Sequence, residues 1–164
     1  MAAQLEEPKY TITQSFDAFE LRRYDANIQA RVQTSGGGAA SGGFRRVARY
    51  IFGGNQTGES IAMTAPVSMW DDNDTGWLAF TMSSAYALET LPAPHDGGVV
   101  LLEQEEKTVA VLSFSGRTTA GKTARLEQKL RKAVATEGLR AVGPAVLAVY
   151  ELSLIHISEP TRPY

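Results

Sequence analysis

Residues 43–55 carry the clearest binding chemistry in the chain. Phe44, Ala48 and Phe52 recur there at every fourth position, with arginines between them. Residues four apart lie on one side of a helix, so this spacing predicts an apolar stripe with guanidinium groups beside it. Such a surface can hold a flat apolar molecule whose acid groups form charge-assisted hydrogen bonds with arginine. The binding residues expected from the pattern are Phe44, Arg45, Ala48, Arg49 and Phe52, with Arg46 as a further cation.

The same pattern also has an ordinary interpretation, in which the stripe belongs to the core and the arginines are solvated. We expect Val47 and Ile51 to be core residues on this basis. For Arg49, ligand contact and a solvated position both stay open.

Side chains able to bind a metal ion are sparse. His95 lies in a Pro-His-Asp loop, where histidine is ordinarily a solvated turn residue, and His156 lies in a C-terminal segment discussed below. Met63 and Met69 are chemically capable of binding iron, but methionine in a strand more often fills a core. We therefore expect none of these four residues to be a strong metal ligand.

Three other motifs are incomplete. Residues 71–74 (DDND) lack the later bidentate glutamate of a calcium loop, and residues 35–38 (SGGG) lack the Gly-Lys-Ser/Thr of a phosphate loop. The basic residues between 119 and 136 fit a solvated helix face, because no aromatic residue is interleaved with them to stack on bases. The sequence predicts neither a metal site nor nucleic-acid binding.

Catalytic groups do not form a recognisable set. The chain has no cysteine, and the sequence places no histidine beside a serine. Tyr150, Glu151 and Glu103 are candidates for an acid or base, but no paired arrangement is visible. We expect a protein that is not an enzyme.

The two halves of the chain share one pattern of elements. Residues 28–34 alternate as a half-buried strand, a glycine-rich turn follows, and residues 40–52 have helical spacing. In the second half, residues 108–114 read as a strand, Ser-Gly follows, and residues 119–136 form a helix that ends at Gly138. A repeated strand–helix–strand unit predicts an α+β fold with two helices packed on antiparallel strands.

Length and composition set the remaining limits. The chain has 164 residues, 43% of them hydrophobic and 21% charged, with a net charge of −2. These values predict one folded domain without a basic field for nucleic acid. The N-terminus lacks the apolar run of a signal peptide, and no apolar stretch approaches the length of a membrane span. We therefore expect a cytoplasmic protein, while its oligomeric state stays open.

Seven segments in order resemble the signature blocks of the SOUL heme-binding family. They are residues 7–10 (EPKY), 19–24 (FELRRY), 43–55 (GFRRVARYIFGGN), 61–67 (IAMTAPV), 86–92 (YALETLP), 109–117 (VAVLSFSGR) and 142–150 (VGPAVLAVY). The resemblance implies duplicated βαββ units that form a distorted antiparallel barrel with two helices, a fold shared with gyrase-inhibitor-like effector-binding domains. It also implies binding of heme or a related tetrapyrrole around Phe44, Ala48, Arg49 and Tyr50, for buffering or transport. Because histidines are so few, we expect heme to be held without a strong axial protein ligand.

Two other functions compete with tetrapyrrole binding. An effector-binding domain of this fold would take other small apolar or cationic ligands. An enzyme would act in the cleft between the two repeats, although the residues provide little support for it.

The resemblance stops near Tyr150. Residues 152–164 (LSLIHISEPTRPY) resemble an in-frame translation of a transposase adaptor used in sequencing libraries. We expect residues 1–151 to form the SOUL domain and residues 152–164 to be a non-native tail, with the terminal strand of the fold missing. On this interpretation residues 152–158 are a poorly packed extension, and removal of residues 152–164 costs about 1 kcal/mol or less.

Overall fold

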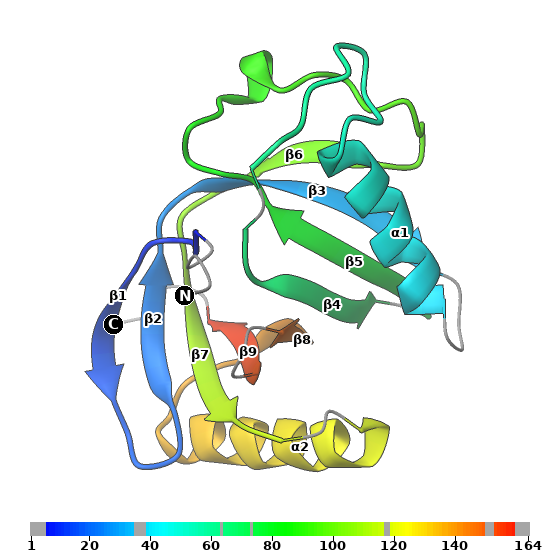
Figure 1. Cartoon of the computed structure of the whole chain (residues 1–164). Helices are drawn as coiled ribbons and strands as arrows, with labels where there is room; N and C mark the ends of the chain where they lie inside the picture. Colours follow the sequence, from blue (N-terminus) through cyan, green and yellow to red (C-terminus); the bar gives the residue numbers. More distant parts are fainter. Residues whose placement is uncertain are drawn as a thin grey trace. The chain divides into compact units, whose positions relative to one another are not determined.

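The structure is a computed structural model that describes residues 6–34, 39–62, 64–72, 74–116, 119–149 and 153–159. The chain divides into two compact units. Unit 1 comprises Met1–Pro8 and Ala26–Glu105, and unit 2 comprises Lys9–Asp25 and Glu106–Tyr164. Each unit has an antiparallel sheet with an α-helix on it among its described residues, so the predicted α+β class is confirmed (Figure 1). No helix in the described part of the chain is long and apolar enough to cross a membrane.

The sheet of unit 1 has the strand order β4-β5-β3-β6, with every pair antiparallel. Its strands are β3 (Asn27–Thr34), β4 (Val67–Asp72), β5 (Thr75–Thr81) and β6 (Val100–Gln104), joined by α1 (Ala39–Ile51) and the short 3-10 helix η1 (Leu88–Thr90). Strand β3 alternates as predicted, with Ala30 and Val32 completely buried and the residues between them on the other face.

The core of unit 1 lies between α1 and this sheet. Val47 and Ile51 of α1 are buried with Leu78 and Phe80 of β5, which confirms the two core residues expected from the helical spacing. Glycine within a helix weakens it by about 1 kcal/mol, but Gly43 has a packing role in α1. A Cβ atom at Gly43 would lie 2.8 Å from Cγ2 of Thr34 and 3.3 Å from Cγ1 of Val32, so a larger residue would force α1 or these side chains to shift.

The sheet of unit 2 has the order β1-β2-β7-β9-β8, again antiparallel throughout. Its strands are β1 (Tyr10–Ser15), β2 (Glu20–Tyr24), β7 (Lys107–Phe114), β8 (Val142–Val149) and β9 (Ser153–Glu159), and its helix is α2 (Ala120–Thr136). The helix begins where Thr119 accepts a hydrogen bond from the backbone of Lys122, and Gly138 follows its end with a φ of 73°. The core beneath α2 contains Leu21, Leu112, Leu126, Leu130 and Val134.

The two units share one connection pattern. In β3-α1-β4-β5 and in β7-α2-β8-β9, the last strand pairs between the other two. Neither sheet closes on itself among the described strands, so the distorted barrel expected from the family resemblance is not confirmed.

The prediction that the fold lacks a terminal strand is wrong as far as the backbone is concerned, because a strand occupies this position. Strand β9 begins two residues after Glu151 and pairs with β7 from Phe114↔Ser153 to Thr108↔Glu159. It pairs on its other side with β8, through Ala148↔Leu154, Leu147↔Ile155 and Val146↔His156. A strand with a partner on each side supplies backbone hydrogen bonds to both neighbours, which explains why an extended segment occupies this position. That residues 152–164 are a non-native tail stays a prediction.

Removal of residues 152–164 should therefore destabilise unit 2 by about 3 kcal/mol or more, because β7 and β8 both lose a partner. Urea denaturation followed by circular dichroism measures this change. The matched control removes only residues 160–164, which leaves β9 whole and should cost about 0.5 kcal/mol or less. Equal, small effects of the two truncations would contradict a stabilising role of β9.

Candidate functional site

The structure places the expected binding residues along α1 and at its end. Phe44 and Phe52 are 42% and 62% exposed, Ala48 is half-buried, and Arg45 and Arg49 are exposed. Phe44 is also anchored, because its ring lies 5.6 Å from that of buried Phe80. These side chains form one edge of the helix beside the buried stripe, which we call the α1 surface: Phe44, Arg45, Ala48, Arg49 and Phe52.

A short turn after α1 fixes the position of Phe52. The side chain of Asn55 is buried, and its Nδ2 donates hydrogen bonds to the carbonyls of Tyr50 (3.0 Å) and Glu59 (2.9 Å). Its Oδ1 accepts from the backbone N–H of Thr57 and of Glu59. The sequence indicated that residues 53–55 end the helix, but it did not show that Asn55 ties the helix end to the following loop.

Arg46 is committed to an ion pair. Its Nε and Nη2 donate to the two carboxylate oxygens of Asp96 at 2.6 and 2.7 Å. These bonds, with a hydrogen bond from the backbone of Gly98, lower the pKa of Asp96 to about 2. Arg45 and Arg49 form no ion pair with a described residue, although the charge of Arg49 helps to lower the pKa of Asp96. They are the cations that the α1 surface offers to a ligand.

Tyr50 does not belong to the α1 surface, although the family resemblance implied that it lies near the ligand. Its side chain is 1% exposed, and its hydroxyl donates to the carbonyl of Pro92 at 2.7 Å. Burial, with smaller contributions from Glu59 and Tyr86, raises the pKa of Tyr50 to about 12. Tyr50 therefore ties α1 to the loop at Pro92 and is out of reach of a surface ligand.

The candidate metal ligands are dispersed. His95 is exposed, and its backbone N–H donates to the carbonyl of Gly54 at 3.1 Å, which places this loop at the end of α1. Met69 packs against the core of unit 1, and Met63 lies outside the described residues. Within the described part of the chain, no three His, Cys, Asp or Glu side chains gather in a way that could hold a metal ion.

The candidate acids and bases do not form a described site. Glu103 is exposed on β6, whereas Tyr150 and Glu151 lie outside the described residues.

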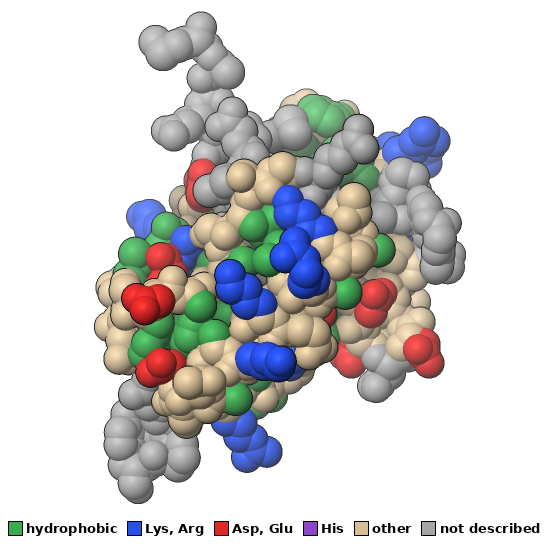
Figure 2. Space-filling model, turned by 90° about the horizontal axis from the view of Figure 1, so that it is seen from below, with side chains coloured by type: hydrophobic (Ala, Val, Ile, Leu, Met, Phe, Trp, Pro, Cys, Tyr) green, Lys and Arg blue, Asp and Glu red, His purple; other side chains and the backbone are tan. Residues whose placement is uncertain are grey.

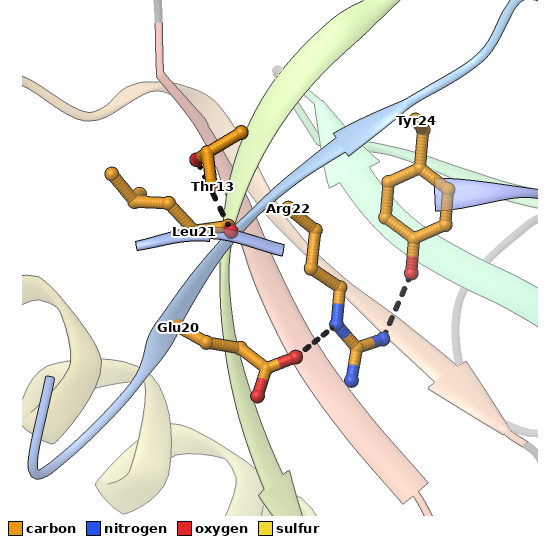
Figure 3. Close-up of polar contacts among 5 residues, drawn as sticks. All are labelled: Thr13, Glu20, Leu21, Arg22 and Tyr24. Carbon is orange, nitrogen blue, oxygen red and sulfur yellow. Dashed lines mark hydrogen bonds and ion pairs between the residues drawn. The ribbon is translucent and has the colours of Figure 1, made fainter. Parts of the chain in front are cut away.

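A polar cluster on β2 of unit 2 was not predicted. Glu20, Arg22 and Tyr24 alternate along the strand and so share one face (Figure 3). Nε of Arg22 donates to Glu20 at 2.6 Å, Nη1 donates to the Tyr24 hydroxyl at 3.0 Å, and the guanidinium lies over the ring of Tyr10. Burial alone lowers the pKa of Arg22, but its bonds to Glu20 and Tyr24 outweigh that effect and raise it. Arg22 is thus a buried cation that its own strand satisfies.

Unit 2 also presents a basic surface on α2. Figure 2, which views the molecule from the side of α2, shows Lys and Arg side chains gathered there. Lys122 bonds to the carbonyl of Ser115 and lies 5.3 Å from the ring of Phe114, while Arg131 pairs with Glu127. The helix contains no aromatic residue, which fits the solvated face expected from the sequence.

Comparisons with known proteins identify the group to which this fold belongs. The chain matches the SOUL heme-binding protein family over residues 5–158 and belongs to that family. The match extends beyond Tyr150, where the signature blocks stop, to residue 158. A sequence comparison with curated proteins gives no significant match.

Solved structures show the same fold at low sequence identity. A hydrolase from Listeria innocua superimposes with a TM-score of 0.65 at 12% identity, covering 96% of this chain and 94% of its own. The C-terminal domain of EcmrR superimposes with a TM-score of 0.67 at 8% identity, covering 93% and 99%. SAV2435 bound to tetraphenylphosphonium gives 0.50 at 8% identity, covering 87% and 93%.

The Arg46–Asp96 pair should make unit 1 acid-sensitive. Because the pKa of Asp96 is about 2 in the folded chain and ordinarily 3.8, the pair stabilises the fold above about pH 4. This contribution is lost as the pH falls through 2. Asp96→Asn should cost about 0.5 kcal/mol at pH 7, since both side chains are about one-third exposed to solvent.

Urea denaturation between pH 7 and pH 2 tests this expectation. The difference between Asp96→Asn and the natural chain should shrink as the pH falls, while exposed Asp72→Asn serves as the control. A constant difference across this range would show that Asp96 acts through something other than its charge.

Proposed function

We propose that the chain binds heme or a related tetrapyrrole on the α1 surface without catalysing a reaction, for buffering or transport. The observation that carries this proposal is the exposure of Phe44 and Phe52 beside two arginines that form no ion pair in the described chain, in a member of the SOUL family. Exposed aromatic side chains grouped with cations are typical of a ligand surface rather than of a solvated helix face.

The α1 surface suits a planar ligand with acid groups. Phe52 comes eight positions after Phe44, which is about 12 Å along a helix. A macrocycle can therefore lie along Phe44, Ala48 and Phe52, with its apolar face removed from water. Arg45 and Arg49 are one turn apart, so both guanidinium groups are available to carboxylates at one edge of the ring.

Iron in the bound heme would have no strong axial ligand from the protein. His95 is the described histidine closest in sequence to this region, and its backbone is held at the end of α1. Its side chain is exposed in a loop, which is the ordinary solvated state of a turn histidine. Apolar packing and the two arginines would then supply the affinity.

An effector-binding function is the second candidate. The fold is shared with SAV2435, whose structure holds tetraphenylphosphonium, a small apolar cation. A heme titration separates the two candidates: a shifted Soret band that saturates at micromolar heme supports tetrapyrrole binding. Absence of that shift, with tetraphenylphosphonium raising the melting temperature, supports the effector domain.

We also propose that residues 152–164 are a non-native tail behind a domain of residues 1–151. The support is the close resemblance of these residues to translated adaptor sequence. Independent amplification and sequencing of the 3′ end of the coding region tests this. Recovery of the codons for residues 152–164 from the source DNA would overturn it.

Arg49→Ala should weaken heme binding by about 1–3 kcal/mol, because a charge-assisted bond to a propionate is lost. Stability should change by only about 0.5 kcal/mol, since Arg49 is exposed. Soret titration and urea denaturation measure the two effects. Arg125→Ala on α2 is the matched control and should alter neither. Unfolding of Arg49→Ala would show that Arg49 is structural.

His95→Ala should leave the heme spectrum and affinity nearly unchanged, because packing and arginine contacts would hold the ligand. A Soret titration of this variant measures both quantities. A tenfold loss of affinity, about 1.4 kcal/mol, or a changed Soret position would identify His95 as an axial ligand.

A further inference from the structure

Both tryptophans of the chain lie together on unit 1, on the sheet face opposite α1. Trp70 of β4 pairs with Trp77 of β5, and their rings stack at 6.3 Å with an interplanar angle of 14°. Both are half-buried. The alternate residues Leu78 and Phe80 of β5 point into the core under α1, so Trp77 belongs to the other face.

Arg31 extends this pair of indoles. Its guanidinium lies 4.9 Å from the ring centre of Trp70, a cation–π distance. Arg31 pairs in register with Ala79, whose small side chain leaves room between β3 and β4 for this contact. Trp70 thus contacts both Arg31 and Trp77. We call these three side chains the indole face: Arg31, Trp70 and Trp77.

Arg31 has no anionic partner among the residues that the structure describes. Its Nε donates to Oε1 of Gln29 at 2.9 Å, but neither Nη atom bonds to a residue that the structure describes. No described carboxylate lies within ion-pair distance of it. Burial lowers the pKa of Arg31, yet an arginine remains charged at neutral pH. A half-buried cation without an anion carries a desolvation cost that a bound anion would offset.

We propose that the indole face is a second binding site, separate from the α1 surface, for a planar aromatic carboxylate. The aromatic ring stacks against the indoles, and the carboxylate accepts hydrogen bonds from the two Nη groups of Arg31. An apolar cation is disfavoured there, because it would meet the guanidinium charge. An uncharged aromatic compound would stack but leave Arg31 without an anion.

The test uses the full chain and two probes of equal shape, naphthalene-2-carboxylate and naphthalene-2-carboxamide. The two indole N–H resonances report on this site directly, because the chain has only two tryptophans. The carboxylate should shift both resonances saturably, and the carboxamide should bind at least tenfold more weakly. Unmoved indole resonances, or equal affinities of the two probes, would overturn the proposal.

Substitutions assign the preference to Arg31. Arg31→Gln should remove the tenfold preference for the carboxylate, whereas Arg31→Lys, which keeps the charge, should retain part of it. Arg125→Gln on α2, an exposed arginine outside both sites, is the matched control and should leave the preference unchanged. Dispersed indole resonances in each variant show that it is folded. A full preference in Arg31→Gln would mean that another group binds the anion.

Heme titration of Arg31→Gln keeps this site distinct from the α1 surface. Heme affinity should be unchanged in the variant, since no residue of the α1 surface is altered. A heme affinity that falls together with that of the carboxylate would show one shared site and overturn the separation. Failure of the natural chain to bind heme would refute the proposed function alone, because the naphthalene probes do not depend on it.

Discussion

Unit 1 depends on the close contact between α1 and strand β3. Gly43 allows the approach, and the buried side chains of Val47, Tyr50 and Ile51 fix how the helix is rotated about its axis. This rotation also determines where the residues beside the buried positions of the helix lie. Phe44 and Phe52 must lie at the border of the core, and the exposed arginines must follow them.

This constraint separates structural from available cations. Arg46 lies where Asp96 reaches both of its nitrogens, and Arg22 of unit 2 has Glu20 two residues away on its own strand. The guanidinium groups of Arg46 and Arg22 are therefore each neutralised by a nearby carboxylate. Arg31 is half-buried, yet among the described residues it contacts only the amide oxygen of Gln29 and the ring of Trp70, neither of which carries a charge. Removing water from an isolated cation costs free energy. An arginine without a carboxylate partner is therefore a better indication of a ligand site than an arginine in an ion pair.

Helical and strand periodicities predicted much of the architecture. The burial of Val47 and Ile51, the alternation of β3 and the limits of α2 all follow from local spacing, which reports directly on a single buried face. The α1 surface was likewise visible as a run of every fourth residue. The role of Asp96 was not, because its partner Arg46 is 50 positions away in the sequence. The partners of Asn55 are only two to five positions away, but spacing alone does not show which backbone groups its side chain bonds to.

Tyr50 shows a different limit of sequence reasoning. It lies in the block that resembles the SOUL family, and proximity in the sequence suggested proximity to a ligand. Its hydroxyl instead bonds to Pro92 inside the unit. The indole face was missed for a related reason: seven residues separate the two tryptophans, and only the pairing of β4 with β5 makes them neighbours.

Strand β9 shows that occupying a strand position and belonging to the native chain are separate matters. Strands β7 and β8 present backbone donors and acceptors that need partners, and any extended segment without proline can supply them because every other residue has the same backbone N–H and C=O groups. Residues 153–159 (SLIHISE) are rich in isoleucine and leucine, contain no proline or glycine, and so favour an extended conformation. Their pairing with β7 and β8 follows from these general properties. Side-chain fit, not backbone pairing, is therefore what distinguishes a native terminal strand from a substitute.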